Sequence, residues 1–143
     1  MMTSMMTAFR PAGPADLAAV ASIQYQSPQA AHWRPVEYLG YEFWVATVDE
    51  LVAGFLVWRR LSADEAEILN LAVAREFRRK RVAEGLFRAA LGEFQGSIFL
   101  EVRESNQSAQ EFYKYLGFEV VNTRAFYYDF PPESAIVMKF HSC

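Results

Sequence analysis

Residues 67–87 read Glu-Ile-Leu-Asn-Leu-Ala-Val-Ala-Arg-Glu-Phe-Arg-Arg-Lys-Arg-Val-Ala-Glu-Gly-Leu-Phe. Residues 68–74 form a short, mainly apolar run, which is typical of a buried strand. Residues 75–81 then carry five of the 14 basic residues. Beyond them, apolar side chains recur at helical spacing, at Val82, Leu86, Phe87, Ala90, Leu91 and Phe94. A strand, a basic turn and a helix leave free backbone N–H groups at the helix start, where phosphate oxygens bind.

Size and composition indicate one folded domain spanning residues 1–143, because a chain this long can bury a substantial core. The net charge of −3 argues against general nucleic-acid affinity. The single cysteine, Cys143, and the two histidines, His32 and His141, offer no metal spacing, so we expect no metal. No apolar run is long enough to span a membrane, and residues 1–8 lack a basic leader region. We therefore expect a cytoplasmic protein with no membrane partner.

The remaining elements follow from periodicity and turn residues. We expect strands at residues 7–10, 42–48, 51–60, 65–74, 97–103, 118–130 and 135–140, with helices at 17–24, 82–96 and 105–117 and a short helix within 29–41. Gly54 in the second hairpin strand predicts a bulge or a close backbone approach. Ser108 with Glu111 fits a capping box. The alternation of strands and helices over residues 65–130 predicts parallel pairing there, within a mixed sheet.

Several of these segments together resemble a known superfamily. They are Glu67-Ile-Leu-Asn-Leu-Ala-Val73, Leu100-Glu-Val-Arg-Glu-Ser-Asn106, Tyr113-Lys-Tyr-Leu-Gly-Phe118, Arg124 with Tyr127-Tyr128, and Ala135-Ile-Val-Met138. The series resembles the GNAT superfamily of acyl-CoA-dependent N-acetyltransferases, and within it the bacterial branch that acetylates the N-terminal alanine of a ribosomal protein. The resemblance implies an α/β (α+β) fold with a mostly antiparallel sheet of six to seven strands, flanked by helices and splayed between the fourth and fifth strands. It also implies acetyl-CoA as the acyl donor and direct transfer to a primary amine, in particular a protein N-terminus.

The phosphate loop departs from the family pattern, Arg/Gln-x-x-Gly-x-Gly/Ala, at one position. Here it reads Arg78-Arg-Lys-Arg-Val-Ala83, so Arg81 replaces the first glycine. Arginine costs little there if φ is negative and about 1 kcal/mol or more if φ is positive. The resemblance implies that the loop holds the pyrophosphate and that a splayed strand binds the pantetheine and thioester through its backbone. The residues concerned are Arg78, Arg79, Lys80, Arg81, Val82, Ala83 and Glu84 in the loop, and Leu71, Ala72 and Val73 in the strand.

Two residues are predicted to be catalytic. Glu101 lies within an apolar strand, where a carboxylate is costly unless it is used or paired, so it is either a functional group or a salt-bridged strand residue. The resemblance implies that Glu101 is the general base, with Glu67 as its rival. It also implies that Tyr113 is the general acid, although Tyr113 lies on the apolar stripe of its helix and could be plain core. Asn106 either contacts the cofactor or caps the helix.

The acceptor side is carried by aromatic residues. Trp33, Tyr38, Tyr127 and Tyr128, with Glu67, are the predicted substrate-binding residues, and for each aromatic ring the alternative is ordinary packing. The acceptor is either a protein N-terminus or a small amine, and the chain is either a monomer or a homodimer. Arg81 also motivates a different class of function, a degenerate non-catalytic acyl-CoA-binding or regulatory module. A nucleic-acid binder using the basic turn is disfavoured by the acidic total charge and the lack of interleaved aromatic residues.

Overall fold

The computed structural model describes residues 6–27, 33–78, 81–129 and 132–142. The described elements are the strands β1 (Thr7–Pro11), β2 (Glu42–Val48), β3 (Leu51–Ser62), β4 (Glu65–Val73), β5 (Gly96–Arg103), β6 (Glu119–Asp129) and β7 (Pro132–Ser142), the α-helices α1 (Leu17–Tyr25), α2 (Val82–Leu91) and α3 (Gln107–Leu116), and the 3₁₀ helices η1 (Pro14–Asp16), η2 (Pro35–Gly40) and η3 (Arg75–Phe77).

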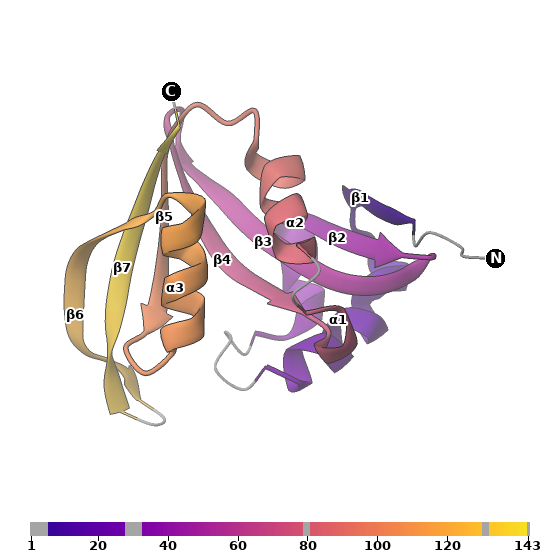
Figure 1. Ribbon diagram of the computed structural model, residues 1–143, viewed down its shortest axis with the longest axis horizontal. Coiled ribbons are helices and arrows are strands. Elements are labelled where there is room, and N and C mark those ends of the chain that lie inside the picture. The colour runs from indigo at the N-terminus through magenta and orange to yellow at the C-terminus, as the bar shows by residue number, and fades with distance from the viewer. Residues whose placement is uncertain (1–5, 28–32, 79–80, 130–131, 143) are drawn as a thin grey trace. The chain divides into compact units, whose positions relative to one another are not determined.

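The strands form a sheet in the order β1-β2-β3-β4-β5-β7-β6 (Figure 1). The β4–β5 pair is parallel, whereas β1–β2, β2–β3, β5–β7 and β6–β7 are antiparallel. The predicted fold class, a mixed and mostly antiparallel sheet of six to seven strands with flanking helices, is confirmed. The parallel ladder covers three residue pairs, residues 65–67 with residues 97–99. The splay that we predicted between these two strands stays a prediction.

Two local expectations were wrong. The second helix ends at Leu91, with Gly92 as its C-cap, and not near Gly96. Gly96 has a φ of +139°, which no helix contains, so the chain has already turned into β5 at this point. The third helix begins after Asn106, whose Oδ1 accepts a hydrogen bond from the Ala109 N–H at 3.2 Å. The N-cap is therefore Asn106, and no capping box starts at Ser108.

The chain divides into two compact units, which we describe separately. The first unit comprises Met1–Arg59 and Leu69–Glu93, and the second unit comprises Arg60–Ile68 and Phe94–Cys143. The division runs through β4, whose first residues pair with β5 in the second unit. That all 143 residues form one domain stays a prediction.

The first unit has an apolar core between α1, η2 and strands β2 to β4. Its fully buried side chains include Val20, Tyr38, Val45, Phe55 and Val57. In the β2–β3 ladder, Ala46 pairs with Gly54 and Thr47 pairs with Val52, so Ala53 bulges out of the pairing. A Cβ on Gly54 would lie 2.9 Å from the carbonyl oxygen of Ala72 in β4. The prediction of a bulge or a close approach at Gly54 is therefore confirmed in both senses.

In the second unit, β7 lies between β5 and β6 (Figure 1). β5 and β7 pair over residues 96–103, whereas the β6–β7 register shifts twice, between Val120 and Asn122 and between Arg124 and Tyr128. β6 is visibly bent (Figure 1). Phe126, inside the second irregularity, has a φ of +53° and is 80% exposed. This irregularity separates Arg124 and Tyr128 on one strand and brings both beside β7.

An ion pair joins β1 to η1. Asp16, which is almost fully buried, accepts hydrogen bonds from both terminal nitrogens of Arg10 and from the Gly13 N–H, each at 2.9 Å. The hydrogen bonds from Arg10 are the largest cause that holds the pKa of Asp16 below its ordinary value. A carboxyl whose pKa is depressed on folding stabilises the fold above its unfolded pKa, and this stabilisation is lost as the pH falls through the folded pKa.

We therefore predict that Asp16→Asn lowers the free energy of unfolding at pH 7 by about 1–3 kcal/mol, because the amide cannot accept all three hydrogen bonds. The difference from wild type should shrink below about pH 4, near the unfolded pKa of aspartate. Urea denaturation at several pH values measures it. Asp129→Asn, which makes the same change at an exposed position of β6, is the control. Equal losses for both variants, or a loss independent of pH, would contradict the prediction.

Candidate active site

The turn before α2 has the backbone shape of an anion site. Arg81 has φ 61° and ψ 21°, in the left-handed region, and is the N-cap of α2. Its carbonyl accepts a hydrogen bond from the Gly85 N–H at 3.0 Å, which closes the first helical turn. An α-helix leaves its first N–H groups outside its own hydrogen-bond pattern. In the described residues, the side chain of the N-cap Arg81 forms no capping hydrogen bond. A left-handed residue followed by such N–H groups is a concave donor site for anions.

Because φ of Arg81 is positive, the larger of the two conformational costs considered above applies. An L-residue in this conformation is destabilised by about 1–2 kcal/mol relative to glycine. The chain therefore keeps a conformation that favours glycine while placing an exposed arginine there. Two further residues of the predicted loop, Arg79 and Lys80, lie outside the described residues.

Arg78 has a role that sequence reasoning missed. Its Nε donates to the carbonyl of Val73 at 3.1 Å, and one terminal nitrogen donates to Ser27 Oγ at 3.1 Å and to the Gln26 carbonyl at 3.4 Å. The neighbouring Arg75 N–H donates to Gln26 Oε1 at 2.8 Å. The guanidinium of Arg78, predicted to bind phosphate, thus joins the basic turn to β4 and to the end of α1.

The backbone of β4 uses its two edges differently. The Ala74 N–H donates to the Ala53 carbonyl at 2.7 Å, so the even-numbered residues, including Ala72, direct their polar groups to β3. Leu71 and Val73 direct theirs to the opposite edge. On that edge the Leu71 N–H donates to Asn70 Oδ1 at 2.9 Å, and the Val73 carbonyl accepts from Arg78. Side chains therefore bind two of the four backbone groups that Leu71 and Val73 place there.

Asn70 belongs to a buried polar network that joins three elements. Its Nδ2 donates to the Tyr38 hydroxyl at 3.0 Å and to Gln24 Oε1 at 3.3 Å, and the Tyr38 hydroxyl donates to Gln24 Oε1. Gln24 Nε2 donates to the Trp33 carbonyl at 2.6 Å. Burial is the largest cause that raises the pKa of Tyr38, so its hydroxyl stays protonated.

Tyr38 is therefore misplaced in our predicted acceptor rim, because its side chain is 0% exposed. Its ring lies in the core against Phe43 and Phe55, and the packing alternative is the one that the structure shows. Trp33 remains partly exposed, with its ring 6.3 Å from that of Tyr38 and 5.8 Å from that of Tyr41.

In the second unit, Glu101 forms an ion pair. Arg124 donates from one terminal nitrogen to Glu101 Oε1 at 2.7 Å, and the Glu101 side chain is 20% exposed. The Arg124 guanidinium also lies 3.9 Å from the ring centre of Tyr127. The hydrogen bond to Glu101 is the largest cause that raises the pKa of Arg124. Of the alternatives for Glu101, the salt-bridged residue is the one that the contacts show, although an ion pair at one oxygen leaves the other available.

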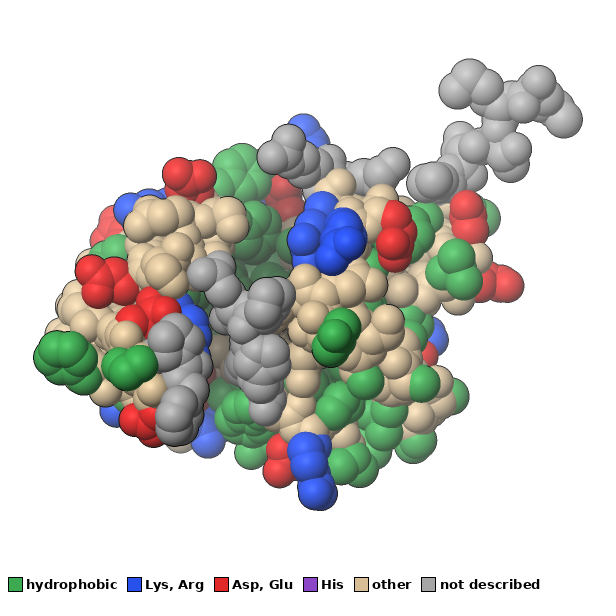
Figure 2. Space-filling view, turned by 90° about the horizontal axis from the view of Figure 1, so that it is seen from below, with side chains coloured by type: hydrophobic (Ala, Val, Ile, Leu, Met, Phe, Trp, Pro, Cys, Tyr) green, Lys and Arg blue, Asp and Glu red, His purple; other side chains and the backbone are tan. Residues whose placement is uncertain are grey.

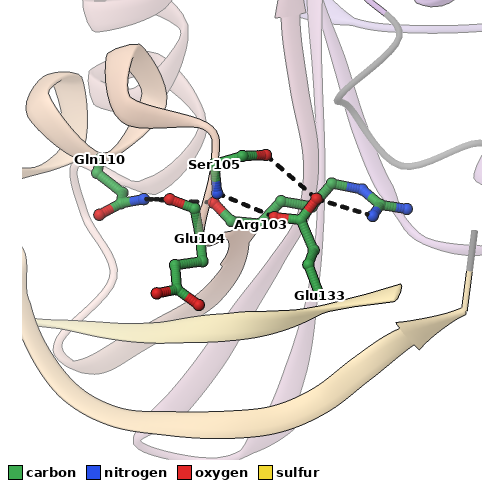
Figure 3. A network of polar contacts seen from close by, with 5 residues as sticks. All are labelled: Arg103, Glu104, Ser105, Gln110 and Glu133. Carbon is green, nitrogen blue, oxygen red and sulfur yellow. Dashed lines mark hydrogen bonds and ion pairs between the residues drawn. The ribbon is translucent and has the colours of Figure 1, made fainter. Parts of the chain in front are cut away.

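A second charged cluster adjoins the first. Glu133 on β7 accepts from Arg103 at 3.3 Å, from the Ser105 N–H at 2.9 Å and from the Ser105 hydroxyl at 3.1 Å (Figure 3). The Arg103 guanidinium lies 4.2 Å from the ring centre of Tyr128. Burial, followed by the charge of Glu101, raises the pKa of Tyr128 to about 12. The structure thus brings Glu101, Tyr127 and Tyr128 together through two arginines that sequence reasoning did not connect.

Tyr113 on α3 is only 7% exposed. Its ring centre lies 5.3 Å from that of Phe112 and 5.4 Å from that of Phe118. Burial raises the pKa of Tyr113, which keeps the phenol neutral. Within the described part of the chain its hydroxyl forms no hydrogen bond. Asn106, for which we left two roles open, is the cap of α3.

Two further observations bear on ligands. Glu67 is partly buried and pairs with Phe99 across the parallel ladder. Among the residues that the structure describes, no three histidine, cysteine, aspartate or glutamate side chains gather as a metal site. Figure 2 shows both acidic and basic side chains among the described residues.

Comparison with known proteins identifies the family. The model of the acetyltransferase (GNAT) family matches residues 5–118. The chain belongs to the GNAT acetyltransferase family. Members of this family are acetyl-CoA-dependent enzymes, so the predicted enzyme class, an N-acetyltransferase, is confirmed. No helix in the described residues is both long enough and apolar enough to cross a bilayer.

Individual relatives support the same assignment. This GNAT protein is 30% identical over 135 residues to a ribosomal protein bS18-alanine N-acetyltransferase of Haemophilus ducreyi, covering 82% of this chain and 90% of that protein. The crystal structure of Ard1 from Thermoplasma volcanium has a TM-score of 0.86 and 31% identity, covering 96% of this chain and 98% of that one. The ribosomal-protein-S18-alanine N-acetyltransferase of Escherichia coli has a TM-score of 0.81 and 25% identity, covering 96% of each chain.

The backbone at Arg81 leads to a prediction about stability. Arg81→Gly should raise the free energy of unfolding by about 1 kcal/mol, because glycine removes the cost of the left-handed conformation. Arg75→Gly, in the same turn but with a negative φ, is the matched control, since it removes the same charge and should lower stability by about 0.5–1 kcal/mol. Urea denaturation measures both. A destabilised Arg81→Gly variant would contradict the assigned backbone conformation.

Proposed function

We propose that this GNAT protein transfers an acetyl group from acetyl-CoA directly to the N-terminal α-amine of a protein. The observation that carries the proposal is the left-handed turn at Arg81, which presents the first N–H groups of α2 as an anion site. The relatives named above as ribosomal-protein alanine N-acetyltransferases support a protein N-terminus as the acceptor. The exact acceptor protein belongs to the proposal as well.

The residues that the structure describes suit acetyl-CoA, an acyl donor that carries phosphate charges and amide groups. We assign the pyrophosphate to the N–H groups of Val82, Ala83 and Glu84, with the Arg81 guanidinium beside them, because donors and positive charge at a helix start favour phosphate. Arg78 would act by holding this turn in place, through the contacts that it makes with Val73, Gln26 and Ser27.

We assign the pantetheine and the thioester to the edge of β4 that faces away from β3. Asn70 and Arg78 already bind the Leu71 N–H and the Val73 carbonyl, so the groups that remain are the Leu71 carbonyl and the Val73 N–H. The Val73 N–H would donate a hydrogen bond to the thioester oxygen of acetyl-CoA, as preorganised backbone N–H groups do in acyl transfer. Ala72 directs its backbone groups to β3, so its contribution would be limited to the shape of the strand.

For proton removal we propose Glu101. An α-amine has a pKa near 8, so a modest base suffices at neutral pH. Arg124 donates to Glu101 Oε1, and no described residue donates to Glu101 Oε2. Glu101 Oε2 would then accept the proton from the amine, directly or through a water. Glu67 remains the rival base.

Tyr113 would assist the departing thiolate. Because burial raises its pKa, the phenol carries its proton throughout the ordinary pH range. A thiol has a pKa of about 8.5, which lies below that of tyrosine, so full proton transfer from Tyr113 to the thiolate is uphill. We therefore propose that Tyr113 donates a hydrogen bond to the developing thiolate without losing its proton. The thiolate is a weaker base than the phenolate of tyrosine, so it leaves unprotonated.

On the acceptor side we propose Tyr127, Tyr128 and Trp33 as contacts for the incoming N-terminus. Tyr127 is 45% exposed and Tyr128 is partly buried, and each ring is oriented by an arginine. The same fold could take a small amine instead. The strained backbone of Arg81 favours one second candidate, a non-catalytic acyl-CoA-binding module, which would bind CoA but acetylate neither peptides nor small amines.

The first test of the proposed function measures acetylation activity. Wild type should acetylate short peptides that begin with alanine faster than small amines. Glu101→Gln should lower kcat by about 10²–10⁴-fold, since general-base catalysis contributes that much. Tyr113→Phe should lower it by about 10²-fold, as loss of one donor to a developing charge does. Initial rates with acetyl-CoA measure all three proteins.

Two controls make the activity test specific. Glu111→Gln, at an exposed position of α3, should leave kcat unchanged. The KM for acetyl-CoA should stay constant in Glu101→Gln, because the carboxylate is assigned to the acceptor and not to the donor. Unchanged rates in both Glu101→Gln and Tyr113→Phe would remove these assignments, and faster turnover of small amines than of peptides would remove the proposed acceptor.

The second prediction concerns cofactor binding. Calorimetry should show that wild type binds CoA and that Arg81→Gly binds it about two- to five-fold more weakly, because an exposed cation beside phosphate is worth up to about 1 kcal/mol. The difference should disappear at high salt. If wild type releases or absorbs no heat on addition of CoA, the proposed acetyl-CoA-dependent function is contradicted. Tighter binding by Arg81→Gly would show that the strained backbone limits affinity.

A further inference from the structure

The junction between β5 and α3 is held by hydrogen bonds from β7, a strand that is distant in sequence but pairs with β5 in the sheet. Glu133, on β7, uses both carboxylate oxygens there: Oε1 accepts the Ser105 N–H, and Oε2 accepts the Ser105 hydroxyl and an Arg103 nitrogen. The side chains of Arg103 and Glu133 are only 15% and 16% exposed. In addition, the Glu104 N–H donates to the Ser134 carbonyl at 3.0 Å. The junction thus has four bonds to β7 that are remote in sequence.

The same junction is held from the side of the helix. Gln110, one turn into α3, donates from Nε2 to the carbonyls of Arg103 and Glu104 at 3.3 and 2.9 Å (Figure 3). Asn106 caps the helix, and its N–H donates to the Arg103 carbonyl at 2.9 Å. Gln110 is buried, so water does not compete well for these bonds. β5, the junction and α3 therefore form one bonded assembly with β7.

Along the chain, the junction lies between the two residues that we propose to act in catalysis. Glu101 precedes the junction on β5, and Tyr113 follows it on α3. The direction in which α3 leaves the junction determines where the Tyr113 hydroxyl lies relative to Glu101. Displacements of about 1 Å in such pairs cost up to about 10²-fold in rate. Nothing else in the proposed chemistry uses Glu133, whose carboxylate is fully occupied by the junction.

We propose that Glu133 is a positioning residue for acetyl transfer, which locks the β5–α3 junction so that Tyr113 is held in a fixed place relative to Glu101. The inference rests on the proposed function. Glu133 contacts neither proposed catalytic group, and it acts through Ser105 and Arg103. A glutamine keeps the length of the side chain but replaces one accepting oxygen with a donating NH₂ group, which opposes the donors at Ser105 and Arg103.

Comparison of four proteins tests this role: wild type, Glu133→Gln, Tyr113→Phe and the double variant. Glu133→Gln should lower kcat at least five-fold while changing the KM for acetyl-CoA by less than two-fold. In the Tyr113→Phe background the same change should lower kcat by less than two-fold, because the hydroxyl that it positions is already absent. Glu104→Gln is the matched control and should retain wild-type kcat, since its carboxylate points away from Glu133 (Figure 3).

The outcomes separate this inference from the proposed function. A wild type without activity on peptides or small amines would overturn both. An active wild type with an equal loss for Glu133→Gln in both backgrounds, or with no loss, would overturn the positioning role alone. If Glu133→Gln does not fold, Ser105→Ala removes the hydroxyl bond to Glu133 and Ser105→Thr should restore it. Failure of threonine to recover the kcat lost in Ser105→Ala would likewise overturn the role.

Discussion

The backbone polar groups of Leu71 and Val73, on the edge of β4 that faces away from β3, need partners, and side chains of the first unit supply two of them. Asn70 accepts the Leu71 N–H, and Arg78 donates to the Val73 carbonyl. Asn70 is held in turn by Gln24 and Tyr38, which brings α1 and η2 against the strand. Because unpaired backbone groups are costly, these side chains stabilise the strand by giving two of the four backbone groups on this edge a partner.

The second unit meets a different constraint, which is the placement of charge beside a sheet. Two carboxylates, Glu101 and Glu133, each have an arginine, and each arginine also lies over a tyrosine ring. Charges that are balanced in pairs can be partly buried at acceptable cost, whereas isolated ones cannot. The bend of β6 makes this possible, because it places Arg124 and Tyr128 beside β7 despite the residues that bulge between them. The pairing also fixes the carboxylate that we propose as the base.

The order of elements, their types and the fold class could be predicted from the sequence, because apolar periodicity and turn residues report locally on helices and strands. Long-range side-chain contacts could not. Tyr38 and Tyr127 are both aromatic residues that we predicted to contact the acceptor, yet one is in the core and the other is exposed. Arg78 was predicted to face phosphate, and its contacts with Gln26 and Ser27 depend on how α1 packs. The conformation of Arg81 was undecided for a similar reason, since backbone torsions at a turn depend on what the following helix requires.

We propose that the edge of β4 and the start of α2 together hold acetyl-CoA through backbone N–H groups. Amide hydrogen exchange followed by NMR, with and without acetyl-CoA at saturating concentration, tests it residue by residue. We predict that the ligand slows exchange at Val73 and at residues 82–84, and leaves the Leu71 N–H unchanged, because Asn70 already binds it. Saturation by acetyl-CoA without protection of Val73 and residues 82–84 would contradict the account.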